Sequence, residues 1–133
     1  VLFALYCLFL LSLSAVHFCD DHAKSLILSA DSPDEQKKCA KGVVGFDRLQ
    51  WLEVAEKHMT DAVFAKFNQN EQLKKILLQT TGWTLVEASI RDFTWGIGRH
   101  VRDPAIVKRA NWSGANLLGK VLIEVRRVLE RQV

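Results

Sequence analysis

The sequence is poor in several residue types, and each scarcity excludes a class of protein. Only 2 prolines and 7 glycines occur among 133 residues, which excludes a collagen-like repeat. The 3 cysteines, Cys7, Cys19 and Cys39, are odd in number and show no Cys-x-x-Cys spacing. Neither a disulfide framework nor a zinc site is therefore expected. Reduced thiols are the simpler interpretation, and they predict a cytoplasmic protein.

Charged residues are missing from one end of the chain. Residues 1–19 contain no Asp, Glu, Lys or Arg, whereas the remainder mixes 18 basic with 15 acidic residues for a net charge of +3. We therefore divide the chain into an apolar leader, 1–19, and a globular domain, 20–133. This balance excludes a disordered chain and a dedicated nucleic-acid polycation. The small positive excess suits an anionic ligand without requiring one.

The leader has three interpretations. Residues 1–16, VLFALYCLFLLSLSAV, resemble the apolar part of a secretory signal, with Ser14 and Ala15 near a potential cleavage point, but they lack a basic start. As a membrane span they fall short of the roughly 20 apolar residues required. A buried helix or an incorrect gene start is the interpretation that we favour, and we expect no stable membrane partner. A genuine signal would instead make the protein secreted or membrane-anchored.

Helix-start signals divide the domain. Ser32 and Glu35 form a capping box around Pro33, which predicts a helix from there to Gly42. Asp47 repeats the device and predicts the main core helix over 47–67.

Two further helices follow from the sequence pattern. Asn70 caps a stretch that ends at Gly82, and residues 116–133 carry apolar side chains at helical spacing. Between these helices, residues 84–90, TLVEASI, alternate as in a half-buried strand. A long irregular loop then covers 91–116. We predict a helix-rich α+β domain with few short strands, which excludes a Rossmann domain and a barrel.

The groups that could carry chemistry cluster around the predicted strand and the loop after it. Carboxylates beside tryptophan and arginine suit an anionic ligand with a planar ring, because an aromatic face stacks on a base and a guanidinium pairs with phosphate. An ion pair capping a turn beside a core tryptophan is the plainer alternative. No metal site and no cofactor are expected. The cluster comprises Glu87, Arg91, Asp92, Trp95, Gly96, Gly98, Arg99, His100 and Arg102.

Several short motifs occur in a fixed order along the chain. They are Lys66-Phe67, Gln69-Asn70, Thr81-Gly82, Leu85-Val86-Glu87, Asp92, Trp95-Gly96, Gly98, Asn116, Leu118-Gly119 and Arg126, with Trp51 fifteen residues before Lys66. The upstream segments SPDEQKK and VVGFD add to them, with Ala40-Lys41 where a Gly-Arg pair would stand. Together these motifs resemble the NADAR family, the YbiA-like N-glycosidases, over about residues 20–131.

The resemblance implies hydrolysis of the bond between a ribose and a nitrogenous base. Its implied substrates are phosphorylated ribosylamino-pyrimidines of riboflavin synthesis or an ADP-ribosylated base, including ADP-ribosylated nucleic acid. It assigns catalytic roles to Asp92, Trp95 and Glu87. The implied substrate-binding residues are Trp51, Lys66, Gly96, Gly98 and Asn116.

One family feature is missing. The family uses a glutamate seven residues before a lysine near the N-terminus, and no carboxylate precedes Asp20 here. One alignment puts that glutamate at Cys7 and the lysine at Ser14, and another puts the glutamate at Val16. We therefore expect an N-terminally truncated domain with impaired hydrolysis. The alternative function is a non-catalytic module that binds nucleotide or ADP-ribose.

Overall fold

The computed structural model describes residues 2–132, with side chains from Leu10 onward. The chain divides into two compact units, unit 1 (Val1–Ala62) and unit 2 (Val63–Val133). Within the described residues no helix has both the length and the apolar character needed to span a bilayer.

In chain order the elements are α1 (Leu2–His17), α2 (Asp21–Ser29), α3 (Pro33–Ala40), α4 (Arg48–Gln69), α5 (Glu71–Leu78), the 3₁₀ helices η1 (Pro104–Val107) and η2 (Arg109–Asn111), and α6 (Leu117–Glu130).

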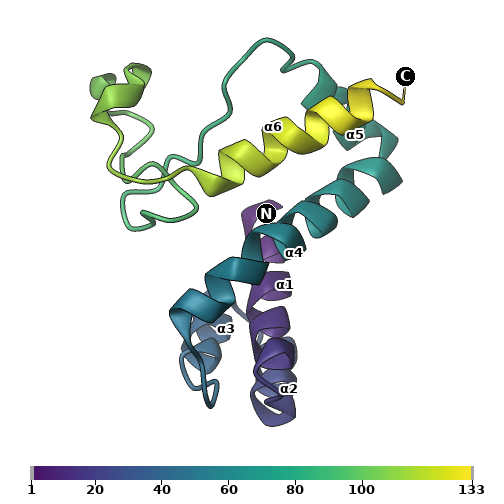
Figure 1. Ribbon diagram of the computed structural model, residues 1–133, viewed down its shortest axis with the longest axis vertical. Helices are drawn as coiled ribbons and strands as arrows, with labels where there is room; N and C mark the ends of the chain where they lie inside the picture. Colours follow the sequence, from purple (N-terminus) through teal and green to yellow (C-terminus); the bar gives the residue numbers. More distant parts are fainter. Residues whose placement is uncertain (1, 133) are drawn as a thin grey trace. The chain divides into compact units, whose positions relative to one another are not determined.

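Unit 1 is built on three short helices that pack against one another, α1, α2 and α3 (Figure 1). Ala15, Ala23, Ile27 and Val43 form their shared buried core. Asp20 connects the start of α2 to the segment after α3, because its carboxylate accepts the N–H of Ala23 at 2.8 Å and that of Val44 at 2.9 Å. These hydrogen bonds cap α2 and lower the pKa of Asp20. The sequence analysis did not predict α2.

The predicted caps are confirmed. The Ser32 side chain accepts the N–H of Glu35 at 3.2 Å and begins α3. Asp47 accepts the N–H of Gln50 at 2.8 Å and begins α4, which ends two residues later than predicted. Asn70 accepts the N–H of Leu73 at 3.1 Å and begins α5. Local sequence is sufficient at these points because the capping side chain and its partner lie only three residues apart.

Unit 2 contains the end of α4, then α5, a long irregular stretch and α6 (Figure 1). α6 packs against α5 through an apolar face. The side chains of Leu118, Val121, Val125 and Leu129 on that face are buried, as the periodicity predicts.

The strand predicted over 84–90 is wrong. Residues 84–89 have no regular secondary structure, and no strand occurs anywhere in residues 2–132. The backbone groups that would pair with a neighbouring strand are used otherwise: the side chain of Asn116 bonds both Leu85 and Glu87, and Ile97 N–H donates to the Glu87 carbonyl at 2.9 Å. The helix-rich architecture is confirmed, whereas the α+β class is not.

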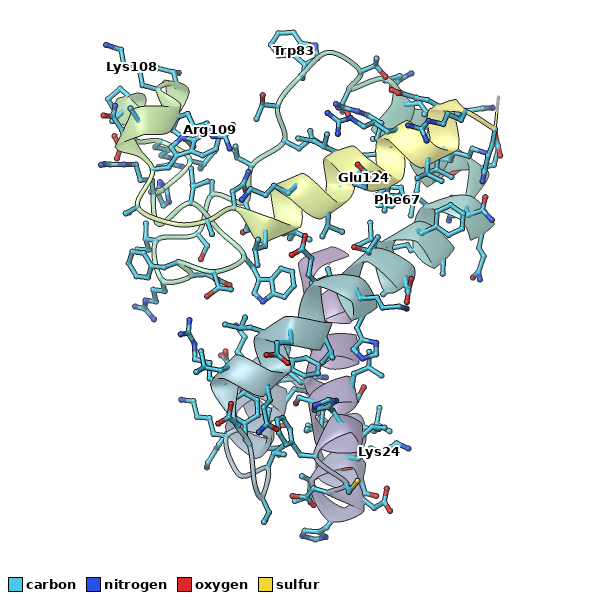
Figure 2. All side chains as sticks on the ribbon, in the orientation of Figure 1. Lys24, Phe67, Trp83, Lys108, Arg109 and Glu124 are labelled. Atoms are coloured by element: carbon cyan, nitrogen blue, oxygen red, sulfur yellow. The ribbon has the colours of Figure 1, made fainter. Side chains whose placement is uncertain are left out.

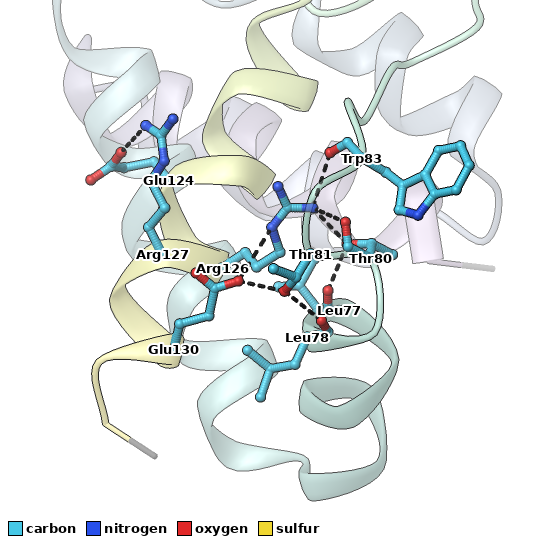
Figure 3. Close-up of polar contacts among 9 residues, drawn as sticks. All are labelled: Leu77, Leu78, Thr80, Thr81, Trp83, Glu124, Arg126, Arg127 and Glu130. Atoms are coloured by element: carbon cyan, nitrogen blue, oxygen red, sulfur yellow. Dashed lines mark hydrogen bonds and ion pairs between the residues drawn. The ribbon is translucent and has the colours of Figure 1, made fainter.

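A buried arginine ties the turn after α5 to α6 (Figure 3). Arg126 is 6% exposed, and its guanidinium donates to the Thr80 carbonyl, to Thr80 Oγ1 at 2.8 Å and to the Trp83 carbonyl at 3.1 Å. Glu130 lies 3.8 Å from its Nε. These contacts fix where the chain leaves α5 and so where the segment toward Glu87 begins.

Candidate functional site

Two carboxylates of unit 2, Glu87 and Asp92, lie within electrostatic range of each other. Glu87 is half-buried, and both this burial and the charge of Asp92 raise its pKa above the ordinary value of 4.5. A pair of neighbouring carboxylates in which the pKa of one is raised is suited to separate acid and base roles. Their proximity is the central feature of the candidate site.

Asp92 is oriented by the chain that follows it. Its Oδ1 accepts the N–H of Thr94 at 3.0 Å and the N–H of Trp95 at 2.7 Å. The backbone of the loop therefore holds one carboxylate oxygen of Asp92 in place.

The loop holding Asp92 is joined to the start of α6 by backbone hydrogen bonds. The N–H groups of residues 115, 116, 117 and 118 donate to the carbonyls of residues 93, 96, 94 and 95, at distances of 2.8 to 3.2 Å. These are the N–H groups that a helix start leaves without helical partners. Loop carbonyls therefore accept hydrogen bonds at the N-terminal end of α6, so these N–H groups are not available to bind a phosphate.

Asn116 is the hub of this arrangement. It is 4% exposed and adopts a left-handed backbone with φ of 54°. Its Oδ1 accepts the N–H of Glu87 at 3.0 Å, and its Nδ2 donates to the Leu85 carbonyl at 3.0 Å. The side chain thus positions the backbone of Glu87, and direct contact of Asn116 with a substrate stays a prediction.

The two predicted glycines serve close packing within the site. A Cβ on Gly96 would lie 2.8 Å from the Asp92 carbonyl oxygen and 3.0 Å from that of Glu87. Gly98 has φ of 68°, and a Cβ there would meet the ring of Phe93 at 2.9 Å. Both glycines let the loop fold tightly beside the two carboxylates, whether or not a ligand also approaches them.

Trp95 completes the unit 2 cluster as a half-buried side chain three residues after Asp92. Lys66, in the last turn of α4, is half-buried too, and its burial lowers the pKa of the amine. The roles of both residues toward a ligand remain predictions.

Trp51 belongs to unit 1 and lies near the start of α4. Its ring stacks on that of His58, with centroids 6.1 Å apart and planes 20° apart, and His17 approaches the indole at 6.1 Å. The half-buried His58 therefore packs on an aromatic ring. Contact of Trp51 with a substrate stays a prediction.

Three other charged candidates of the cluster, Arg99, His100 and Arg102, contact residues of their own loop rather than Glu87 or Asp92 in the interactions that follow. Arg99 contacts Asp103 at 2.8 Å and donates through Nε to the Asn111 carbonyl. Its guanidinium lowers the pKa of Asp103. His100 Nδ1 accepts the N–H of Arg102 at 3.1 Å. The ion pair that caps a turn, the plainer interpretation above, is thus realised by Arg99 and Asp103 rather than by Asp92.

Two glycines that matter here were not predicted. A Cβ on Gly114 would overlap the Gly96 carbonyl, and one on Gly119 would overlap the Leu85 carbonyl and the Asn116 amide. Gly119 lies on α6, so its requirement comes from a contact more than thirty residues away in sequence. Only the NxLG spacing of the motif signals it.

Comparison with known proteins identifies relatives of this chain. The model of the NADAR domain matches residues 6–130. N-glycosidase YbiA of Escherichia coli is 31% identical over 115 residues, which cover 86% of this chain and 65% of that protein. N-glycosidase R617 of Acanthamoeba polyphaga mimivirus is 39% identical over 94 residues, 68% of this chain and 53% of that one. Protein irg-1 of Caenorhabditis elegans is 43% identical over 79 residues, 59% of this chain and 37% of that one.

A solved structure agrees with these matches. The NMR structure of E. coli YbiA superposes with a TM-score of 0.74 at 27% identity, covering 96% of this chain and 67% of that chain. The chain spans 37% to 65% of the length of the three relatives above. The family model covers most of the chain and the fold agrees with it, so this protein belongs to the NADAR domain family.

Proposed function

We propose that this protein is an N-glycosidase that hydrolyses the bond between a ribose and a nitrogenous base. The observation that carries the proposal is the Glu87–Asp92 pair, in which the charge of Asp92 helps to raise the pKa of Glu87. Two of the relatives, YbiA and R617, carry the name N-glycosidase, which supports the same reaction.

The reaction needs an acid and a stabilising negative charge. The bond from the anomeric carbon of the ribose to the base nitrogen breaks, a water hydroxyl adds to that carbon, and a proton goes to the nitrogen. The transition state carries positive charge on the sugar. A carboxyl with a raised pKa is suited to donate the proton, so we assign Glu87 as the acid. Asp92 then stabilises the sugar cation and orients the water.

The remaining predicted residues supply binding and position. Trp95 offers an aromatic face for the base. Trp51 is assigned to substrate binding on the family resemblance alone. Lys66 is assigned to the phosphate or another anionic group of the substrate, and Asn116 to its polar edges as well as to the backbone of Glu87.

Substrate, compartment and class are proposed on the resemblance and the composition. A phosphorylated ribosylamino-pyrimidine of riboflavin synthesis and an ADP-ribosylated base are the two substrate classes to test. The free thiols of Cys19 and Cys39 support a cytoplasmic location. The α+β class is proposed on the family resemblance alone.

Release of free base, followed by chromatography, tests the reaction with each substrate class. We expect impaired but measurable turnover by the wild-type chain, because the glutamate that the family carries near its N-terminus is missing. Asp92→Asn keeps the acceptor for Thr94 and Trp95 but removes the charge, so it should lower this turnover by a further factor of about 10² to 10⁴. Asp34→Asn, at an exposed carboxylate of α3, is the matched control and should keep full activity.

Equal activity in Asp92→Asn and the wild type would remove Asp92 from the mechanism. Binding of ADP-ribose by a folded wild-type chain that releases no base from either substrate class would contradict the proposed hydrolysis. It would favour the non-catalytic binding module instead.

A further inference from the structure

The chain that follows α5 has two backbone edges, and Asn116 binds only one of them. Residues 84–89 contain no helix, turn or bend, so the backbone runs extended there. In an extended chain, the N–H and C=O groups of one residue point to one side and those of the next residue point to the other side. Leu85 and Glu87 both bond the Asn116 side chain, at 3.0 Å. The groups that point away from Asn116 are therefore those of Thr84, Val86 and Ala88.

We name the backbone N–H and C=O groups of these three residues the outer edge. Among residues 2–132, no hydrogen bond uses the N–H or the C=O of Thr84, Val86 or Ala88. The side chains of Thr84 and Val86 are exposed as well. The outer edge ends at Ala88, because the Ser89 N–H turns back to the Glu87 carbonyl at 3.0 Å. A row of unpaired N–H and C=O groups on an extended chain is a template for pairing with another strand.

The sequence of this segment lacks the features with which proteins prevent such pairing. Exposed edges are commonly protected by lysine, by proline or by a bulge. Residues 84–90 contain no lysine and no proline, and Glu87 is their only charged residue. Thr84, Val86 and Ile90 are β-branched, which favours an extended and paired backbone. The outer edge is therefore open to a partner strand.

A second copy of the same segment matches the outer edge by symmetry. In an antiparallel pair, two facing residues of this kind exchange both of their N–H···O bonds. When Val86 lies opposite Val86 of the second copy, Thr84 lies opposite Ala88 and Ala88 opposite Thr84. Every group of the outer edge is then paired, which no shifted register achieves. The arrangement has a two-fold axis, as most homodimers have.

The side chains favour the same register. Val86 meets Val86 of the second copy at the axis, which makes a β-branched cross-strand pair. Glu87 lies opposite the apolar Leu85 of the second copy. A shift that moves the axis to Glu87 would set two carboxylates opposite each other, which is unfavourable. The position of the single charge therefore selects the register centred on Val86.

Trp83 extends the contact beyond the outer edge. Its side chain is 74% exposed, and Figure 2 shows it projecting away from the ribbon of unit 2. In the register centred on Val86, Trp83 lies opposite Ser89 of the second copy. An indole that faces a small side chain buries apolar area against the facing strand. The dimer thus covers a large aromatic surface that a single copy leaves in water.

We propose that this protein forms a symmetric dimer in which the outer edges of two copies pair antiparallel about Val86. The second copy then contributes Leu85 to the candidate site, because that side chain lies opposite Glu87. The inference stands apart from the proposed function, since pairing requires neither substrate nor turnover. A strand of unrelated sequence lacks the two-fold match, so we commit to the second copy.

Sedimentation velocity between about 10 μM and about 1 mM protein tests for the dimer. The mean mass should rise from that of one chain toward that of two, over a high concentration range because a pair of short strands is only marginally stable. Val86→Pro removes one N–H donor from each copy and should weaken the association at least about tenfold. Val86→Thr keeps the N–H and the β-branched shape, so it should stay within about threefold of the wild type.

A charge exchange at position 86 tests the register. Val86→Lys and Val86→Glu each set like charges opposite each other at the axis, so each variant alone should associate at least about threefold more weakly. An equal mixture of the two variants should regain the association, because opposite charges then face each other. Val107→Lys and Val107→Glu, at a position that is 82% exposed and outside the segment, are the matched controls. They should associate like the wild type, both alone and mixed.

Amide hydrogen exchange, followed by NMR, identifies the edge that pairs. The N–H groups of Thr84 and Val86 should exchange more slowly at high protein concentration than at low concentration. The Glu87 N–H bonds Asn116 within its own copy, so its exchange should not depend on concentration.

A chain that stays monomeric over the whole concentration range would overturn the inference. Association that persists unchanged in Val86→Pro, or that the mixture of charge variants does not restore, would place the contact elsewhere and overturn it as well. Circular dichroism checks the fold of each variant, and the charge exchange decides the outcome should Val86→Pro fail to fold. No turnover is measured, so failure of the proposed hydrolysis leaves this result unaffected, and the converse also holds.

Discussion

Asn116 and Glu87 are joined by a 3.0 Å hydrogen bond from the Glu87 backbone N–H to the Asn116 side-chain oxygen. The same side chain donates to the Leu85 carbonyl. One buried carboxamide therefore makes the backbone hydrogen bonds that a neighbouring strand would otherwise make to the segment that carries Glu87. This contact links the start of α6 to the candidate site across 29 residues of sequence.

Replacement of Asn116 by alanine should lower the free energy of unfolding by about 2–4 kcal/mol. It leaves a buried N–H and a buried carbonyl without partners and puts a Cβ-bearing residue in a left-handed backbone. Urea denaturation measures the loss. Asn116→Gly relieves the backbone cost but not the lost hydrogen bonds, so it should recover only part of the stability. Full recovery by glycine would mean that the carboxamide contributes nothing.

The raised pKa of Glu87 predicts a pH-dependent stability with a defined sign. The folded state holds the Glu87 proton more tightly than the unfolded state, whose pKa is near the ordinary value of 4.5. The linked stabilisation is therefore complete below that value and is lost as the pH rises through the higher pKa of the folded protein.

Glu87→Gln cannot ionise, so its free energy of unfolding should exceed that of the wild type above this window, by a margin that disappears toward about pH 4. Urea denaturation between about pH 4 and about pH 8 measures the margin. Asp92→Asn removes the neighbouring charge and should bring the pKa of Glu87 closer to ordinary, as followed by NMR titration of its carboxyl carbon. A margin that stays constant with pH would contradict the raised pKa.

How far the sequence predicts the structure depends on the distance between partners. Ser32, Asp47 and Asn70 are identified correctly because each caps a helix through a partner three residues away. The prediction of a strand over 84–90 is wrong although the sequence alternates there. The backbone bonds the side chain of Asn116, 31 residues from Leu85, instead of a neighbouring strand, and no local pattern specifies that contact.

The candidate site divides in the same way. Clustering in the sequence predicts that Glu87, Asp92 and Trp95 occupy one region, and the effect of Asp92 on Glu87 agrees with that. The clustering does not predict that Arg99 and His100, only a few residues later, belong to a closed loop over residues 98–113 with its own ion pair. This loop is closed by the hydrogen bond from the Ser113 N–H to the Ile97 carbonyl, a contact that short-range periodicity does not reveal.

Asp92 should contribute to stability as well as to catalysis. Its Oδ1 accepts two backbone N–H groups, so Asp92→Ala should lower the free energy of unfolding by about 1–2 kcal/mol. Asn keeps the acceptor oxygen and should stay within about 0.5 kcal/mol of the wild type. Urea denaturation of the two variants separates these outcomes, and an Asp92→Ala chain as stable as the wild type would dismiss the capping role.

Two consecutive arginines on α6 should differ sharply in their effect on stability. Arg126 is buried and donates to Thr80 and Trp83, whereas Arg127 is exposed and contacts the exposed Glu124 at 3.4 Å (Figure 3). A lysine at position 126 keeps the charge, but it lacks the guanidinium Nη1 that donates to both Thr80 and Trp83. Arg126→Lys should therefore lower the free energy of unfolding by about 2–4 kcal/mol.

The neighbouring substitution provides the control for this prediction. Arg127→Lys retains an exposed charge and should change the free energy of unfolding by less than about 0.5 kcal/mol, because a surface ion pair contributes little. Urea denaturation of both variants gives the comparison. Equal effects at the two positions would show that the turn at Thr80 does not depend on the buried guanidinium. The large effect at Arg126 alone is expected because Arg126 fixes the chain at the point where it leaves α5 for Glu87.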